Sequence, residues 1–317
     1  MVLQLARRFG VLLVSVAVST VVVFGFMQVL PGNPARVALG VNASDEAVAR
    51  MTAQYGLDRP LIVQYVDWIG GMLRLDPGIE YISRAAIGPQ IADRLLVTLW
   101  LVGAATVVAV LVAVPLGTWM AMRHRHLDGV VLSGLSQLGV AVPAFLAGIL
   151  LISVFAVRLG WLPSAGWVVP AQDPVQFARR LILPSISLAL VQGSVLARYV
   201  RSAVLDELHQ DYLRTAQAKG LRPVQAVFRH TLRNAAVPVL TVLGLQLAGL
   251  LIGAVVVERV FVIPGLGSLL LDSVRERELL TVQSVVMVLV LAVLFINFVV
   301  DALYVVIDPR LRTGGRV

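Results

Sequence analysis

Six long apolar stretches dominate the sequence and limit its fold more than any other feature. They cover residues 9–30, 95–122, 130–157, 181–200, 235–257 and 283–307. About 20 apolar residues in a helix cross the hydrocarbon core of a bilayer. The chain is 58% hydrophobic and only 14% charged, which excludes an ordinary soluble domain. The sequence therefore predicts an all-α polytopic membrane protein with six transmembrane helices, the third running through Pro143 and the first uncleaved.

The distribution of charge predicts the orientation of these helices. Six spans place both termini on one side, together with the segments 123–128 and 198–235, and basic residues outnumber acidic ones there. Many of the arginines on the other side of the membrane lie in the long segment 31–93, and long loops cross the membrane largely regardless of their charge. We therefore expect both termini to be cytoplasmic and segment 31–93 to be extracytoplasmic.

A polar stretch between the fourth and fifth spans has the sequence pattern of two short helices joined by a hinge. Asp211 is a suitable N-cap, Lys219 suits a helix C-terminus, and Gly220 suits the left-handed residue that follows a helix. Pro223 can then open a second helix. The pattern predicts a short cytoplasmic helix with Tyr212 and Ala216 on one face, although ordinary capping in a polar loop is the plainer interpretation.

This stretch resembles a known family, the permease subunits of binding-protein-dependent ABC importers for dipeptides, oligopeptides and nickel. The resemblance rests on residues 211–221 and continues through residues 230–238. Arg214, Thr215 and Arg233 depart from the general motif but are typical of its peptide branch. Further similar segments are residues 31–34, 56–60, 264–267 and 308–310, whereas residues 75–81 depart from the family and leave the conformation of residues 75–93 open.

The resemblance implies a type I ABC importer permease fold and a set of partners. These are a second permease subunit, two ATP-binding subunits, an extracytoplasmic substrate-binding protein and membrane lipids, with no nucleic acid. It also implies that the cytoplasmic segment couples the chain to an ATPase. The coupling residues would be Asp211, Tyr212, Leu213, Arg214, Thr215, Ala216, Ala218, Lys219, Gly220 and Leu221.

The chain's own residues do not predict an enzyme. The sequence contains no phosphate-binding loop and no cysteine, and its single lysine is Lys219. His124 and His126 lack the further ligands that a metal site needs, so we expect no metal, no catalytic residue and no directly bound cofactor. ATP and Mg²⁺ would be bound by the partner subunits.

Polar residues inside the spans are candidates for a translocation path. Gln192, Gln246 and Asn297 could line such a path, or they could form hydrogen bonds between helices. Asp301 could likewise face the path or form an ion pair near the interface. An ion-coupled secondary transporter would need charged sites of this kind, and it remains an alternative to an ABC importer. A membrane scaffold without transport activity is a second alternative.

These inferences divide the chain into four parts. Residues 1–30 hold the N-terminus and first span, and residues 31–93 form an extracytoplasmic region with short helices. Residues 94–310 form the permease core, including the coupling loop 201–235, and residues 311–317 form a cytoplasmic tail. We expect a multi-pass protein of the bacterial inner membrane. Its substrate could be a dipeptide, a longer peptide, a glutathione-like peptide or a nickel chelate, and a peptide is preferred.

Overall fold

The computed structural model describes residues 2–29, 34–40, 42–208, 210–218, 220–227 and 231–307, and these form helices almost throughout. Within these described ranges, five helices are long and apolar enough to cross a membrane: α1 (Val2–Val29), α5 (Ile87–Met122), α8 (Pro174–Leu208), α11 (Leu232–Val260) and α13 (Leu279–Ile307). A sixth span results if α6 (Leu127–Ala141) and the helix after it are counted as one. The predicted all-α membrane fold is confirmed.

The third predicted span is broken, contrary to the prediction of one continuous helix. α6 ends at Ala141, and α7 (Ala144–Leu151) continues into a π-helical segment, Ile152–Arg158, at an angle of 102° to α6. Val142 has an extended backbone, with φ −86° and ψ 120°, and Pro143 follows it. Proline has no N–H to donate and disfavours a helical residue before it, so the break occurs here. By contrast, Pro115 and Pro184 lie inside continuous helices.

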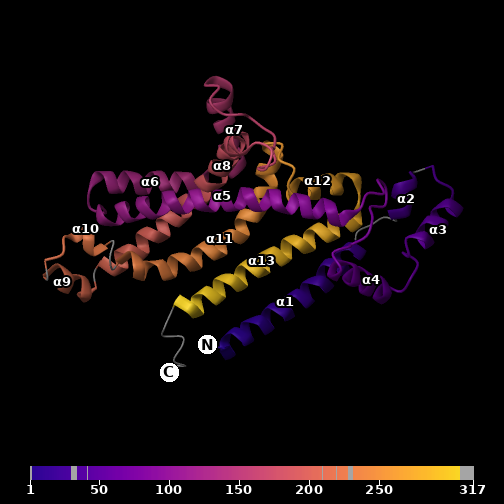
Figure 1. The fold of residues 1–317 in the computed structure, drawn as a ribbon, viewed down its shortest axis with the longest axis horizontal. Helices are drawn as coiled ribbons and strands as arrows, with labels where there is room; N and C mark the ends of the chain where they lie inside the picture. Colours follow the sequence, from indigo (N-terminus) through magenta and orange to yellow (C-terminus); the bar gives the residue numbers. More distant parts are fainter. Residues whose placement is uncertain are drawn as a thin grey trace. The chain divides into compact units, whose positions relative to one another are not determined.

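The chain forms two compact units, which we name by their content. The core unit comprises residues 1–8, 99–263 and 296–317, and the loop unit comprises residues 9–98 and 264–295. In the core unit, α6, α7 and α11 all pack against α8, which can be followed along the helices labelled in Figure 1. α9 (Asp211–Ala218) and α10 (Pro223–Ala226) follow α8 and contact each other.

Small residues permit the close packing of helices in the core unit. A Cβ atom at Gly117 of α5 would lie 2.6 Å from the carbonyl oxygen of Ala197 in α8. A Cβ atom at Gly139 of α6 would overlap the hydroxyl of Ser194, also in α8. Both approaches would be closer than a van der Waals contact. Glycine at these positions therefore allows α5 and α6 to approach α8 closely, as small residues do in membrane helix pairs.

The loop unit contains the short helices expected in residues 31–93. These are α2 (Pro34–Leu39), α3 (Asp45–Gln54) and α4 (Leu61–Leu73), and α12 (Leu266–Glu276) belongs to the same unit. The Ser44 hydroxyl accepts a hydrogen bond from the Ala47 amide and caps α3. Trp68 of α4 packs with Val23 and Met287 in a buried apolar cluster.

A buried carboxylate organises the segment whose conformation the sequence left open. Glu278 is 1% exposed, and its side chain accepts hydrogen bonds from the amides of Tyr81, Ile82 and Ser83, at 2.7, 2.7 and 3.1 Å. The same segment forms an antiparallel bridge between Ile79 and Ala86. Glu278 therefore holds the turn after α4 to the junction between α12 and α13.

Candidate functional site

The short helix predicted after the fourth span is present as α9, and its C-terminus has a defined cap. Gly220 adopts φ +91°, and the Leu221 amide donates to the Ala216 carbonyl over 3.2 Å. A left-handed residue followed by this bond is the Schellman arrangement, which satisfies carbonyls at a helix end. The structure thus confirms the expected left-handed Gly220 and the second helix from Pro223. Asp211 is the first residue of α9 rather than the residue before it.

The two faces of α9 differ in exposure. Leu213 is 1% exposed and Ala216 is 8% exposed, so one face of the helix is buried within the chain. Asp211, Thr215 and Ala218 are exposed along the other face, at the spacing of successive helical turns. Among the described side chains of α9, this second set is accessible to solvent, while Ala216 contributes to internal packing.

A hydrogen-bonded cluster joins α9 to both neighbouring membrane helices. The Tyr212 hydroxyl donates to Oε2 of Glu207, near the end of α8. The Asn234 side-chain amide, in the first turn of α11, donates to the same oxygen over 3.3 Å. Burial raises the pKa of the Tyr212 hydroxyl, and its bond to Glu207 raises it further. Tyr212 therefore remains a protonated donor at neutral pH, and Glu207 links three helices.

Glu207 and Asn234 were not among the coupling residues expected from the sequence. The available signal was weak: a single carboxylate five positions before a tyrosine, at the end of an apolar helix. Of the expected residues, Leu221 is partly buried, whereas Lys219 and the side chain of Arg214 lie outside the described parts of the chain. The remaining members of the expected set lie together on α9 and its cap.

All three candidate path residues belong to the core unit and are partly buried. Gln192 lies in α8, Gln246 in α11 and Asn297 in α13. Among the described residues, the Gln192 amide nitrogen and both polar atoms of the Gln246 side chain have no hydrogen-bond partner. Within the described parts of the chain, hydrogen bonds between helices therefore do not pair these amide atoms. Unpaired amides are costly inside a membrane, which favours a polar path or a second chain as their partner.

Asp301 takes part in an ion pair rather than in this polar set. Its carboxylate lies 2.7 Å from the guanidinium of Arg8 in α1, and both residues belong to the core unit. An ion pair was the plainer of the two interpretations of Asp301, and the structure contains one, with Arg8. A charged residue paired in this way offers no support for an ion-coupled carrier.

Comparison with known proteins identifies the family. Residues 113–313 match the model of the binding-protein-dependent transport system inner membrane component, and residues 1–102 match the model of its N-terminal part. The chain is 42% identical over 309 residues to the glutathione transport system permease protein GsiC of Salmonella choleraesuis, covering 97% of this chain and 98% of the relative. It is 39% identical to the protein of that name from Escherichia coli K12, covering 96% and 97%.

A solved structure supports the fold. The MetNI methionine ABC transporter, in an inward-facing conformation, contains a chain that matches with a TM-score of 0.56 and 17% identity. The match covers 69% of this chain and 96% of the other. Together with the apolar helices, the family match makes this a multi-pass inner membrane protein. The chain belongs to the binding-protein-dependent transport system inner membrane component family, and it is an ABC importer permease of the peptide and nickel group.

Proposed function

We propose that this chain imports short peptides of the glutathione type as the first of two permease subunits. The observation that carries the proposal is the 42% identity, over 97% of the chain, with relatives named for glutathione transport. Glutathione is a tripeptide, so this likeness supports the peptide preferred from the sequence over a nickel chelate. The partners would be a second permease, two ATP-binding subunits and an extracytoplasmic substrate-binding protein.

The coupling segment would receive force from an ATP-binding subunit through the exposed face of α9. Asp211, Thr215 and Ala218 are accessible there, and the side chain of Leu213 anchors the opposite face. When the ATP-binding subunits close, α9 would move as one body because its C-terminus is capped at Gly220. ATP and Mg²⁺ would stay on the partner subunits, and this chain would contribute no catalytic residue.

The Glu207 cluster supplies a route from α9 to the membrane helices. Displacement of Tyr212 would pull on Glu207 at the end of α8 and, through it, on Asn234 at the start of α11. The same two helices carry Gln192 and Gln246. A small movement at α9 would thereby change the spacing of polar groups that we assign to the translocation path. Coupling through packed helices with two arrangements is a common basis of such transitions.

The test begins with copurification from the native membrane in mild detergent. Mass spectrometry should recover a second permease and ATP-binding subunits with this chain. Proteoliposomes made from that complex and its binding protein should accumulate labelled glutathione or trialanine only when ATP is supplied. Uptake should persist when an uncoupler dissipates the proton gradient. Peptide uptake that needs a proton gradient and proceeds without ATP would refute the proposal in favour of a secondary carrier.

A further inference from the structure

The loop unit contains a partly open cavity of about 500 Å³, and none of the expected coupling or path residues lines it. Its walls come from the end of α1, from Pro34 at the start of α2, from residues between 52 and 81 and from the start of α13, all within this unit. Small-molecule sites in proteins commonly measure about 300–1,000 Å³. The cavity is therefore large enough to hold a peptide of two or three residues.

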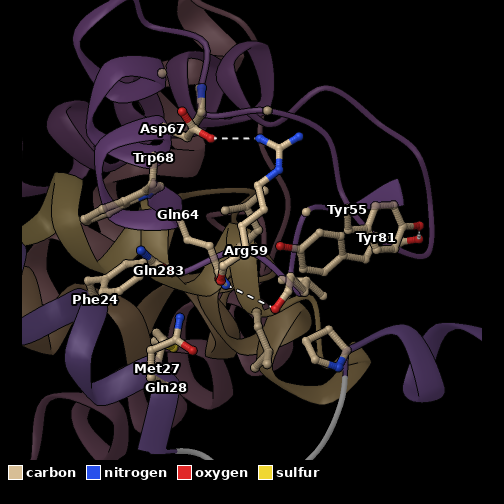
Figure 2. A pocket seen from close by; sticks show the side chains of 18 of the residues that line it. Phe24, Met27, Gln28, Tyr55, Arg59, Gln64, Asp67, Trp68, Tyr81 and Gln283 are labelled. Atoms are coloured by element: carbon tan, nitrogen blue, oxygen red, sulfur yellow. Dashed lines mark hydrogen bonds and ion pairs between the residues drawn. The ribbon is translucent and has the colours of Figure 1, made fainter. Parts of the chain in front are cut away.

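One wall presents two buried hydrogen-bond donors. Trp68 and Gln283 are each 6% exposed, and Figure 2 shows them beside Phe24. Among the described residues, neither the Trp68 indole nitrogen nor the Gln283 amide nitrogen has a hydrogen-bond partner. Leaving a buried donor unpaired is costly, so such groups in a cavity favour a ligand with acceptor oxygens.

The cavity also carries a cation that a ligand can reach. Arg59 lies 3.2 Å from Asp67, and both side chains are more than half exposed, at 58% and 61%. An exposed ion pair of this kind is weak, so a ligand carboxylate can compete with Asp67 for the guanidinium. Figure 2 shows Tyr55 and Tyr81 grouped on the side of Arg59 away from Trp68, and their ring centroids lie 4.5 Å apart.

We propose that this cavity is a peptide-binding site on the permease itself. Arg59 would bind the C-terminal carboxylate, and the Trp68 and Gln283 donors would bind carbonyl oxygens of the peptide backbone. The aromatic walls would contact its side chains. Because segment 31–93 is predicted to be extracytoplasmic, the site would hold peptide on that side of the membrane. The proposal rests on the proposed peptide import and adds a second place where the substrate is held.

The experiment measures peptide binding to the importer assembled without its binding protein. The complex is placed in phosphatidylcholine nanodiscs and titrated with trialanine, trialanine amide and glutathione in a calorimeter. Trialanine and glutathione should bind saturably. Trp68→Phe, which keeps an aromatic ring, and Gln283→Leu should each raise the Kd of trialanine about tenfold. Gln90→Leu is the matched control because Gln90 does not line the cavity, and its Kd should equal that of the wild type.

A second comparison isolates the role of Arg59. Arg59→Gln should raise the Kd of trialanine about tenfold or more, since a hydrogen-bonded charge pair is lost. Trialanine amide lacks the carboxylate, so it should bind the wild type weakly and lose little further affinity in the Arg59→Gln variant. Equal losses for both peptides would overturn the assignment of Arg59 to the carboxylate.

The remaining outcomes separate this proposal from the proposed function. No saturable binding by the assembled permease, together with ATP-driven uptake when the binding protein is added, would overturn the cavity site alone. Saturable binding without any uptake would support the cavity site and overturn peptide import. Native mass spectrometry could instead find phosphatidylglycerol retained through Arg59 and not displaced by trialanine. That result would make the cavity a lipid headgroup site and overturn the proposal.

Discussion

The hydroxyl of Tyr212 offers the sharpest test of how α9 is connected to the membrane helices. In the variant Tyr212→Phe the ring remains, and only the donor to Glu207 is removed. A hydrogen bond to a charged acceptor contributes about 1.5–3 kcal/mol. Tyr212 is partly exposed and Asn234 still donates to Glu207, so the lower figure applies. A loss of about 1.5 kcal/mol would raise the ratio of detached α9 to α9 bonded to Glu207 roughly tenfold.

Two readouts follow from this shift. In proteoliposomes containing the complete importer, Tyr212→Phe should hydrolyse ATP at a rate close to that of the wild type but consume several times more ATP for each peptide transported. Hydrogen exchange of the α9 amides should be faster by about tenfold, since a weaker attachment opens more often. Tyr199→Phe is the matched control because Tyr199 is 47% exposed on α8 and lies outside this cluster.

If Tyr212→Phe transports peptide with the wild-type ATP requirement and its α9 amides exchange as slowly as before, the cluster does not connect α9 to α8. Glu207→Gln gives a second check, because the amide can still accept a hydrogen bond but carries no charge. We expect its effect to be smaller in the same direction.

Three further perturbations test other features. Gly220→Ala should destabilise the C-terminal cap of α9 by about 1–2 kcal/mol, because φ +91° is strained for alanine although there is space for its Cβ atom. Hydrogen exchange of the Leu221 amide should then accelerate about tenfold. Ala216 is buried, so Ala216→Trp should disrupt the packing of α9 and accelerate hydrogen exchange of its amides. Thr215 is exposed, so Thr215→Trp should keep α9 ordered but reduce copurification with the ATP-binding subunits. Burial, with smaller effects of Tyr55 and Glu278, raises the pKa of Tyr81 to about 12 from an ordinary 10.0. Since the unfolded chain ionises first, this contribution to stability is complete below pH 10 and should fall by up to about 3 kcal/mol towards pH 12. Comparing thermal unfolding of the wild type and Tyr81→Phe across this pH range measures the loss.

Each of these expectations has a contradicting result. Unchanged exchange at Leu221 in Gly220→Ala would mean that the cap is not held by the left-handed residue. Equal loss of the ATP-binding subunits in both tryptophan variants, with α9 equally ordered, would mean that the two faces of α9 are not distinct. A Tyr81→Phe protein that loses stability between pH 10 and 12 as steeply as the wild type would exclude Tyr81 as the cause.

Much of the fold follows from the sequence because apolar length and helix caps are local properties. The apolar stretches predicted the long helices, and Gly220 predicted where a short helix ends. The break at Pro143 was missed because a proline can either remain inside a membrane helix, as Pro184 does, or interrupt it. Which outcome occurs depends on whether neighbouring groups satisfy the freed carbonyls, and neighbours are not visible in a sequence.

Contacts between distant residues explain what else could not be predicted. Glu278 binds amides almost 200 positions earlier in the chain, at Tyr81 and its neighbours. The sequence shows Glu278 only as one charge in a polar segment. The cavity beside Arg59 likewise combines residues from α1, the segment before α5 and α13. Neither feature has a periodic pattern or a fixed spacing that would reveal it.

The coupling motif illustrates why burial has to be added to a sequence resemblance. In the sequence alone, residues 211–221 form one set that would contact a partner. In the fold they divide into an exposed row that includes Thr215 and a buried row that includes Leu213 and Ala216. A helix without a buried row would not be held against the rest of the chain. A helix without an exposed row would have no surface for a partner subunit to bind. Because Tyr212 is hydrogen-bonded to Glu207, a partner that pressed on the exposed row would, under the proposed function, displace the end of α8 through this bond.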